Sequence, residues 1–320
     1  MEVVDEAGKI NVNAADKGTL MRLPGMTEDV ADAIQDWTDE DDEPRAGGAE
    51  EGYYRQLEYG YRVRNGHMRT VRELLMVRGV DEGLMYGPDW EGAGQAQVVA
   101  SYDENEGWVN YLTVYSKDPD LDAEGERRVN INSADEGALA RNLGIEREQA
   151  QWIVENRPDD GYDNIADLIS ESSAPRAGEG RGGGLDLETF KEIADKITVH
   201  DKDSVPPRVN VNTAGIAVLR ALFGDDEGGA NLAEAIVSYR AALAAGMDSV
   251  GDLLDVPGLS ISDFKRVADV VTVRSDVYNV RCEAYGVRGQ DPGARVCSEA
   301  VIDRNGEPFD MLYWYCGARN

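Results

Sequence analysis

One short motif occurs three times along this chain of 320 residues. In each copy two asparagines alternate with β-branched residues, and the copies occupy residues 10–13, 129–132 and 209–212. A helical pattern and a break containing glycine follow every copy. An internal repeat indicates that one structural unit is used several times, so the motif constrains the architecture more than any single residue does. The pattern is typical of helix-hairpin-helix units, which bind nucleic acid or build scaffolds.

We expect the second asparagine of each copy to cap a helix, because its side chain can accept a hydrogen bond from a free helical N–H group. These predicted caps are Asn13, Asn132 and Asn212. A second capped segment follows in each unit, where Ser, Thr or Asn precedes an acid at capping-box spacing. These caps are Thr70, Asn164 and Ser249. Each unit is therefore expected to contain two helical hairpins.

Segments of β character lie between and after the helical units. Residues 107–117 alternate in the manner of a strand, and three strand-like runs end the chain, the last two joined by Arg304-Asn305-Gly306. We predict an α+β fold of tandem helix-hairpin-helix (SAM-like) units with a C-terminal antiparallel β-meander. The predicted domains are a first helical unit with an acidic insertion (1–95), a strand-containing connector (96–126), a second helical unit with a glycine-rich loop at 177–184 (127–204), a third helical unit (205–272) and the meander (273–320).

All three cysteines lie in the C-terminal β-rich region. None has the spacing of a zinc site, and both histidines are distant in sequence. If the turn of the first hairpin lies near Gln290, Cys282 lies opposite Cys297, and these two form the first-choice disulfide. Free, buried thiols are the alternative.

The chain is strongly acidic, with 62 acids against 32 bases and a formal charge of −30. Such a charge is repelled by phosphate backbones, although solubility alone also explains it. Thr27 and Ser260 replace the second glycine of a phosphate-binding hairpin, and acids follow both. We therefore expect no nucleic-acid binding, and a DNA-uptake or repair scaffold is the alternative function. The scarcity of histidine and the lack of a phosphate-binding loop also argue against an enzyme.

One acidic segment is a candidate metal site. It contains Asp39, Asp41, Asp42, Glu43 and, after a glycine turn, Glu50. Crowded carboxylates repel one another unless they are solvated or neutralised, and calcium prefers oxygen ligands. We expect calcium here, with a solvated acidic loop as the alternative. A second Asp-x-Asp-x-Asp pattern at residues 118–122 lacks the central glycine of an EF-hand loop.

Several longer motifs resemble the type II secretion system minor pseudopilin K family. They are residues 5–13, residues 36–45 with the following Gly48-Ala49-Glu50 and Tyr53-Tyr54, the Glu73-Leu74-Leu75 segment, residues 111–116 and the closing Leu312-Tyr313-Trp314-Tyr315. The resemblance covers nearly the whole chain. It implies two of the asparagine motifs, whereas this chain has three.

The resemblance also implies a fold and a function. The helical units would be inserted in a pilin-like fold. The protein would be a non-enzymatic tip subunit of the pseudopilus that binds minor pseudopilins I and J, initiates assembly and caps the fibre during protein export. Exported proteins are further candidate partners. Members of the family bind calcium and are anchored in the bacterial inner membrane by an N-terminal helix that this sequence lacks, so the chain is expected to be the periplasmic part.

Overall fold

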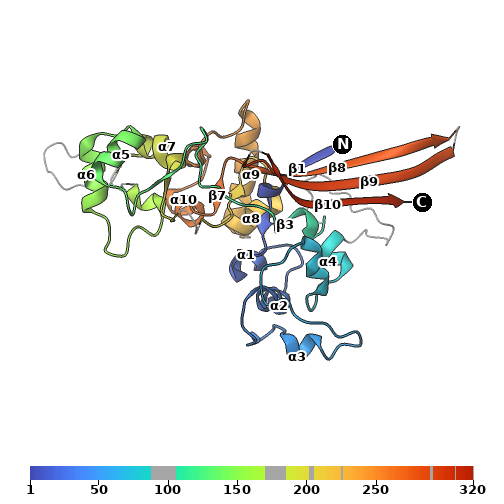
Figure 1. Ribbon diagram of the computed structural model, residues 1–320. Helices are drawn as coiled ribbons and strands as arrows, with labels where there is room; N and C mark the ends of the chain where they lie inside the picture. Colours follow the sequence, from blue (N-terminus) through green and yellow to red (C-terminus); the bar gives the residue numbers. More distant parts are fainter. Residues whose placement is uncertain are drawn as a thin grey trace. The chain divides into compact units, whose positions relative to one another are not determined.

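A computed structural model describes residues 1–87, 106–169, 185–201, 205–224, 226–288, 291–306 and 308–319 (Figure 1). The chain divides into two compact bodies. The first comprises Met1–Lys117, Thr213–Asp226 and Ser275–Asn320, and the second comprises Asp118–Asn212 and Glu227–Arg274. Both bodies contain helices and the first contains an antiparallel sheet, so the expected mixture of helix and sheet is confirmed.

The elements of the first body are short apart from three strands. Its α-helices are α1 (Lys17–Met21), α2 (Glu28–Thr38), α3 (Glu51–Tyr54), α4 (Glu82–Tyr86) and α8 (Ile216–Phe223). Its 3-10 helices are η1 (Glu6–Gly8), η2 (Val71–Met76) and η3 (Trp108–Asn110). Its strands are β1 (Glu2–Asp5), β2 (Ile10–Asn11), β3 (Leu112–Thr113), β8 (Val277–Arg288), β9 (Asp291–Asp303) and β10 (Asp310–Arg319).

The second body is mainly helical. Its α-helices are α5 (Glu136–Leu143), α6 (Arg147–Glu155), α7 (Leu187–Ile193), α9 (Glu227–Ala242) and α10 (Ile261–Val267). Its 3-10 helices are η4 (Ile165–Leu168), η5 (Ala194–Lys196) and η6 (Val250–Asp255), and its strands are β4 (Val129–Asn130), β5 (Ile197–Thr198), β6 (Val209–Asn210) and β7 (Val271–Thr272). The predicted glycine-rich loop at 177–184 lies outside the described residues. Nowhere in the described ranges is a helix long and apolar enough to cross a membrane.

The sheet of the first body has the strand order β1-β8-β9-β10 (Figure 1). Its last three strands pair antiparallel in sequence order, which confirms the predicted meander. The strand β1 pairs antiparallel with β8 and was not predicted, because four residues are too few to show an alternating pattern.

The predicted disulfide between Cys282 and Cys297 is wrong. Cys282 lies opposite Ser298, so Cys297 lies one position away and on the other face of the sheet. The cause is a register shift between Tyr285 and Val287, since a bulge places one extra residue in one strand of a hairpin. The predicted turn at Gln290 lies outside the described residues, and all three cysteines are free.

Each asparagine motif forms a short strand that pairs in parallel with a strand far along the sequence. The pairs are β2 with β3, β4 with β5, and β6 with β7. Because the second strand of each pair follows the helices, the pair closes the helical unit. The strand expected within residues 107–117 is therefore the closing strand of the first unit, which extends beyond the boundary expected at residue 95. Helix α8, expected in the third helical unit, belongs to the first compact body.

The prediction that Asn13, Asn132 and Asn212 cap helices is wrong. The N-cap residues are Asp16, Asp135 and Gly215, three positions later. In each motif the side chain of the first asparagine accepts a hydrogen bond from the N–H group of the second. This local turn competes with helix formation and delays the start of the helix.

The second asparagine instead bridges two backbone segments. In the second helical unit, Asn132 Oδ1 accepts from the Tyr162 N–H at 2.7 Å, and Asn132 Nδ2 donates to the Tyr162 carbonyl at 3.0 Å. Asn13 bonds in the same way to Met68, and Asn212 to Met247. We call this arrangement the asparagine bridge.

The residue bound by each bridge, which is Met68, Tyr162 or Met247, lies two positions before the cap residue of a capping box. The predicted caps Thr70, Asn164 and Ser249 are confirmed, and the paired acids Glu73, Asp167 and Asp252 accept from the backbone N–H groups of these caps. The helices that they begin are the short η2, η4 and η6. The bridge therefore sets where the second half of each unit starts.

Loss of one bridge should destabilise the fold measurably. We expect Asn132→Ala to lower the free energy of unfolding by about 1–3 kcal/mol, because it leaves backbone groups of a packed turn without partners. The matched control is Ser133→Ala, which changes the exposed neighbouring residue. Urea denaturation followed by circular dichroism measures both, and equal stability of the two variants would contradict the role of the bridge.

Candidate metal centre

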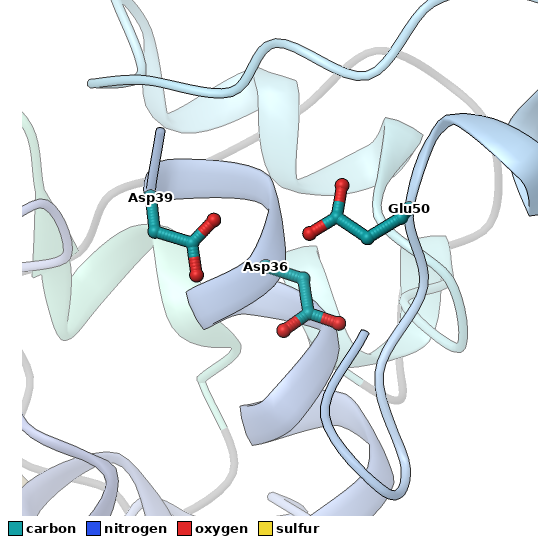
Figure 2. Close-up of side chains that lie close together, drawn as sticks. All are labelled: Asp36, Asp39 and Glu50. Carbon is teal, nitrogen blue, oxygen red and sulfur yellow. The ribbon is translucent and has the colours of Figure 1, made fainter. Parts of the chain in front are cut away.

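Three carboxylates of the first body converge at the end of α2 (Figure 2). Asp36 lies in the last turn of α2, Asp39 is its C-cap residue and Glu50 immediately precedes α3. The spacing of Asp36 and Asp39 places both on one side of the helix end. One oxygen of each of the three groups lies within 4.8 Å of the others. We call these three residues the acidic centre.

Several oxygens of the acidic centre are buried without a hydrogen-bond partner. Asp36 is fully buried and Glu50 is 5% exposed. Both carboxylate oxygens of Glu50 and Oδ1 of Asp39 have no partner. A buried carboxylate that nothing neutralises is costly, so these oxygens provide unfilled positions for a cation.

One arginine neutralises part of the charge. Arg45 Nη1 lies 2.7 Å from Asp36 Oδ1 and 2.5 Å from Asp39 Oδ2. These two carboxylates raise the pKa of the Arg45 guanidinium. A single positive charge faces three carboxylates, and no ion pair between Arg45 and Glu50 is formed among the described residues.

Glu50 is the least stabilised member of the acidic centre. Burial, followed by repulsion from Asp36 and Asp39, raises the pKa of its carboxyl group to about 7. In the absence of a cation, Glu50 is therefore partly protonated at neutral pH. A bound cation would reverse the balance and favour the carboxylate.

Two glycines allow the Glu50 segment to approach α2 closely. A Cβ atom on Gly48 would lie 1.8 Å from Asp36 Oδ2, and one on Gly47 would lie 2.7 Å from the Cα atom of Asp29. The backbone N–H of Gly47 also donates to Asp32 Oδ2 at 3.1 Å. A residue with a side chain at either glycine would push this segment away from the helix.

The structure brings together only part of the predicted ligand set. Asp39 and Glu50 belong to the acidic centre, whereas Asp41, Asp42 and Glu43 are exposed outside it. The reason is that α2 ends at Thr38, after which the chain turns into solvent.

Local hydrogen bonds hold the three exposed acids in this loop. The Asp41 carboxylate accepts from the backbone N–H of Glu43 at 2.8 Å, and Asp42 accepts from Asn65 Nδ2 at 2.9 Å. Asp36 was missed as a ligand. Its three-residue spacing from Asp39 on a helical pattern was the signal that could have identified it.

In the second acidic pattern, at residues 118–122, Asp118 and Asp122 are satisfied within the protein, whereas Asp120 Oδ1 is buried without a hydrogen-bond partner. Asp118 pairs with Arg128 and Arg208, each at 3.1 Å, and Asp122 Oδ1 accepts from two backbone N–H groups of the following turn. Within the described residues these acids form no group with metal-site geometry. Arginines and backbone groups therefore supply the partners of Asp118 and Asp122.

The hairpin turns that resemble DNA-binding turns are also satisfied internally. Thr27 and Ser260 accept hydrogen bonds from the first turns of α2 and α10. Asp263 completes a capping box with Ser260, and Glu28 and Asp29 lie in the first turn of α2. Carboxylates at these helix ends oppose the binding of a phosphate group.

From the acidic centre we predict a specific pH dependence of the free energy of unfolding when no metal is bound. In the folded protein Glu50 keeps its proton up to pH about 7, whereas in the unfolded chain it releases the proton near its ordinary pKa of 4.5. Stability therefore falls as pH rises between these values, and the maximal loss is about 3 kcal/mol. We expect Glu50→Gln to be more stable than the parent chain at pH 8 in chelator, and to have no advantage at pH 4.

Urea titrations at both pH values test this expectation. The control is Glu40→Gln, which changes an exposed acid of the same loop and should show no such pH dependence. An equal effect of the two substitutions on the free energy of unfolding at pH 8 would contradict the raised pKa of Glu50.

Comparison with known proteins relates the chain to one component of a secretion system. Two family models, both described as type II secretion system (T2SS), protein K, match residues 8–86 and 209–274. The type II secretion system protein K of Dickeya chrysanthemi is 27% identical over 161 residues, which cover 49% of this chain and 37% of that protein. The protein of the same name from Pectobacterium carotovorum subsp. carotovorum is 30% identical over 105 residues, covering 26% of this chain and 32% of that protein.

The chain thus spans 37% and 32% of the length of these curated relatives. Among solved structures, a chain of the GspK-GspI-GspJ complex from the type 2 secretion system of enterotoxigenic Escherichia coli aligns with a TM-score of 0.42 and 14% identity, over 98% of this chain and 78% of that chain. The two matched family regions contain the first and third asparagine motifs, together with the acidic centre. The chain belongs to the type II secretion system protein K family of minor pseudopilins.

Proposed function

We propose that this chain acts by binding and not by catalysis, as the tip subunit of a type II secretion pseudopilus. In this role it initiates pseudopilus assembly and caps the fibre during protein export. Its family supports the proposal, and the observation that carries it is an exposed apolar face on the four-stranded sheet.

The apolar face extends across all four strands. Val3, Val280, Ala300 and Trp314 stand side by side on β1, β8, β9 and β10. Trp314 is 58% exposed and Val3 is 55% exposed. The next row along the sheet contains only Cys282, Ser298 and Cys316, so neither row contains a charged side chain. An exposed apolar patch of this kind is typical of a protein interaction surface.

The opposite face of the sheet faces its own body. There, the ring of Tyr313 lies 6.2 Å from that of Tyr115, and Arg281 pairs with Glu299 at 3.0 Å. The face that carries Trp314 is therefore the one we assign to docking.

We infer that the docking partners are minor pseudopilins I and J, whose pilin-type helices would cover this face. The solved complex with GspI and GspJ is named for that assembly, which supports the same choice of partners here. In the proposed arrangement, helix-hairpin-helix units inserted in a pilin-like fold are too broad for the shaft of the fibre and cap its end. The full-length protein would be anchored in the inner membrane, with this part in the periplasm.

We further propose that the acidic centre binds calcium. Asp36, Asp39 and Glu50 offer the carboxylate oxygens that this hard cation prefers, and three of these oxygens have no other partner. A bound calcium ion, with its two positive charges, would together with Arg45 balance the three carboxylates and hold the loop before α3 against the end of α2. Its role would be structural, in keeping the first helical unit folded.

Binding to the partners gives a direct test of the function. We expect the chain to form a one-to-one-to-one complex with the soluble domains of pseudopilins I and J, read by size-exclusion chromatography with light scattering. Trp314→Ser should weaken the complex at least tenfold, because exposed aromatic residues dominate such interfaces. Tyr59→Ser, which changes an aromatic residue that is 84% exposed, is the control. Failure of the parent chain to bind either partner would contradict the proposal.

Calcium binding has its own readout in the isolated chain. We expect calcium to stabilise it by about 2.7 kcal/mol when the free ion is at a hundred times its dissociation constant. Asp36→Asn should abolish this gain, and Asp41→Asn, at an exposed acid of the same loop, should leave it unchanged. Thermal unfolding with calcium or chelator measures the effect. Equal stabilisation of the two variants would show that the ion binds elsewhere.

A further inference from the structure

One run of the first body has a charge opposite to that of the rest of the chain. Residues 59–72 contain four arginines and one histidine but no aspartate or glutamate. Acids make up 62 of the 320 residues, and the formal charge of −30 becomes −34 when the four arginines of this run are left out. We call residues 59–72, which lie between α3 and α4 (Figure 1), the basic strip.

The basic strip has little regular structure, yet its backbone is held at several points. The Tyr61 hydroxyl donates to the Met76 carbonyl at 2.6 Å, and the Val63 N–H donates to Glu51 Oε2 at 3.1 Å. The asparagine bridge holds both backbone groups of Met68. These contacts fix the strip before a ligand arrives, so less conformational entropy is lost on binding.

One carboxylate gathers several residues of the strip around it. Glu73 Oε1 accepts from the Arg69 N–H at 2.8 Å and from the Thr70 N–H at 3.3 Å. The other oxygen of Glu73 forms an ion pair with Arg64 Nε. Arg64 and Arg69 therefore meet at the same acid, and Arg72 directly precedes that acid in the sequence. Because Glu73 carries a single charge and pairs with Arg64, it does not neutralise the remaining arginines.

Three arginines of the strip keep N–H donors available to a ligand. Arg62, Arg69 and Arg72 are all exposed. Within the part of the chain that the structure describes, Arg62 and Arg69 form no ion pair. Arg72 Nη2 lies 3.9 Å from Glu299 Oε2, which is beyond hydrogen-bond distance, and the Arg72 side chain is 53% exposed.

Acids meet the strip near its middle. Asn65 Nδ2 donates to the Asp41 carbonyl at 2.6 Å and to Asp42 Oδ1 at 2.9 Å, so the exposed acidic loop after α2 lies against this point. The strip thus has cations on both sides of Asn65, at Arg62 and at Arg69, and negative charge beside it. A ligand with a few separate acidic groups suits this pattern better than a continuous line of negative charge.

The chemistry of arginine and the charge of the chain narrow the ligand further. A guanidinium group can bind a carboxylate through two parallel N–H···O bonds. At about 0.15 M salt, charges more than about 8 Å apart are largely screened, so a short ligand responds to the strip and not to distant acids. A nucleic-acid duplex or an anionic membrane would extend beyond the strip over the acids of the remaining surface, which repel phosphate groups. Charge complementarity therefore favours a short acidic segment of a protein.

We propose that the basic strip binds a short acidic segment of a partner protein through Arg62, Arg69 and Arg72. Each of these arginines pairs with a carboxylate of the partner, and the fixed backbone of the strip sets the spacing of the pairs. The strip contains no residue of the acidic centre or of the apolar docking face. The inference therefore goes beyond the proposed function and does not depend on it.

Fluorescence anisotropy of a labelled hexaglutamate peptide tests the proposal with this chain alone, at about 0.15 M salt. We expect saturable binding of hexaglutamate and none of hexaglutamine, which has the same length without the charge. Arg69→Gln should weaken binding about threefold, as expected for one exposed ion pair. The triple variant Arg62→Gln, Arg69→Gln, Arg72→Gln should weaken it about thirtyfold, since separate exposed pairs contribute additively.

The matched control is Arg141→Gln, which removes an exposed arginine of α5 in the second body and should leave binding unchanged. Equal weakening by Arg69→Gln and Arg141→Gln would show that only net charge matters and would overturn the proposal. The absence of hexaglutamate binding, or full binding by the triple variant, would overturn it as well. Phosphatidylglycerol vesicles and a short DNA duplex test the other polyanions. Tighter binding of either one than of hexaglutamate, lost in the triple variant, would assign the strip to phosphate and overturn the choice of a protein segment.

Discussion

The repeated helical units depend on one interaction, the asparagine bridge. Asn13, Asn132 and Asn212 each satisfy both backbone groups of a residue in an irregular segment. Backbone polar groups in packed loops must find partners, and a side-chain amide can supply a donor and an acceptor at once. The bridge fixes the start of the second capped helix, whatever the length of chain between the two ends. Insertions between those ends are therefore tolerated.

The acidic centre lies within the segment that the first bridge closes, between Asn13 and Met68. That segment buries carboxylates whose charge it does not fully neutralise, and it uses two adjacent glycines to bring Glu50 to the end of α2. Such an arrangement has a free-energy cost in the absence of a cation. Retaining it in a short loop is reasonable if an ion holds the loop in place, which is the role that we propose for calcium.

The sheet of the first body separates two chemical environments. One face presents Trp314 and its apolar neighbours to solvent, and the other turns Asn279, Arg281 and Glu299 inward around a small cavity. Alternation along the stretches between the register shifts produces this division, because successive side chains point to opposite faces. An exposed apolar surface and a set of inward charged and amide side chains therefore occur on the same three strands.

Local patterns in the sequence determined much of this protein. The repeat, the capping boxes at Thr70, Asn164 and Ser249, and the C-terminal meander all rest on contacts between near neighbours in sequence, so spacing was sufficient to predict them. Tertiary structure decided the rest. The roles of Asn13, Asn132 and Asn212 depend on partners 30 to 55 residues away, which no local pattern reveals. A single bulge placed Cys282 opposite Ser298. The end of α2 brought Asp36 into the acidic centre and left Asp41, Asp42 and Glu43 outside it. In each case the outcome depended on the direction in which a side chain points. A shift of one residue in strand register, or one turn at the end of a helix, is enough to reverse that direction.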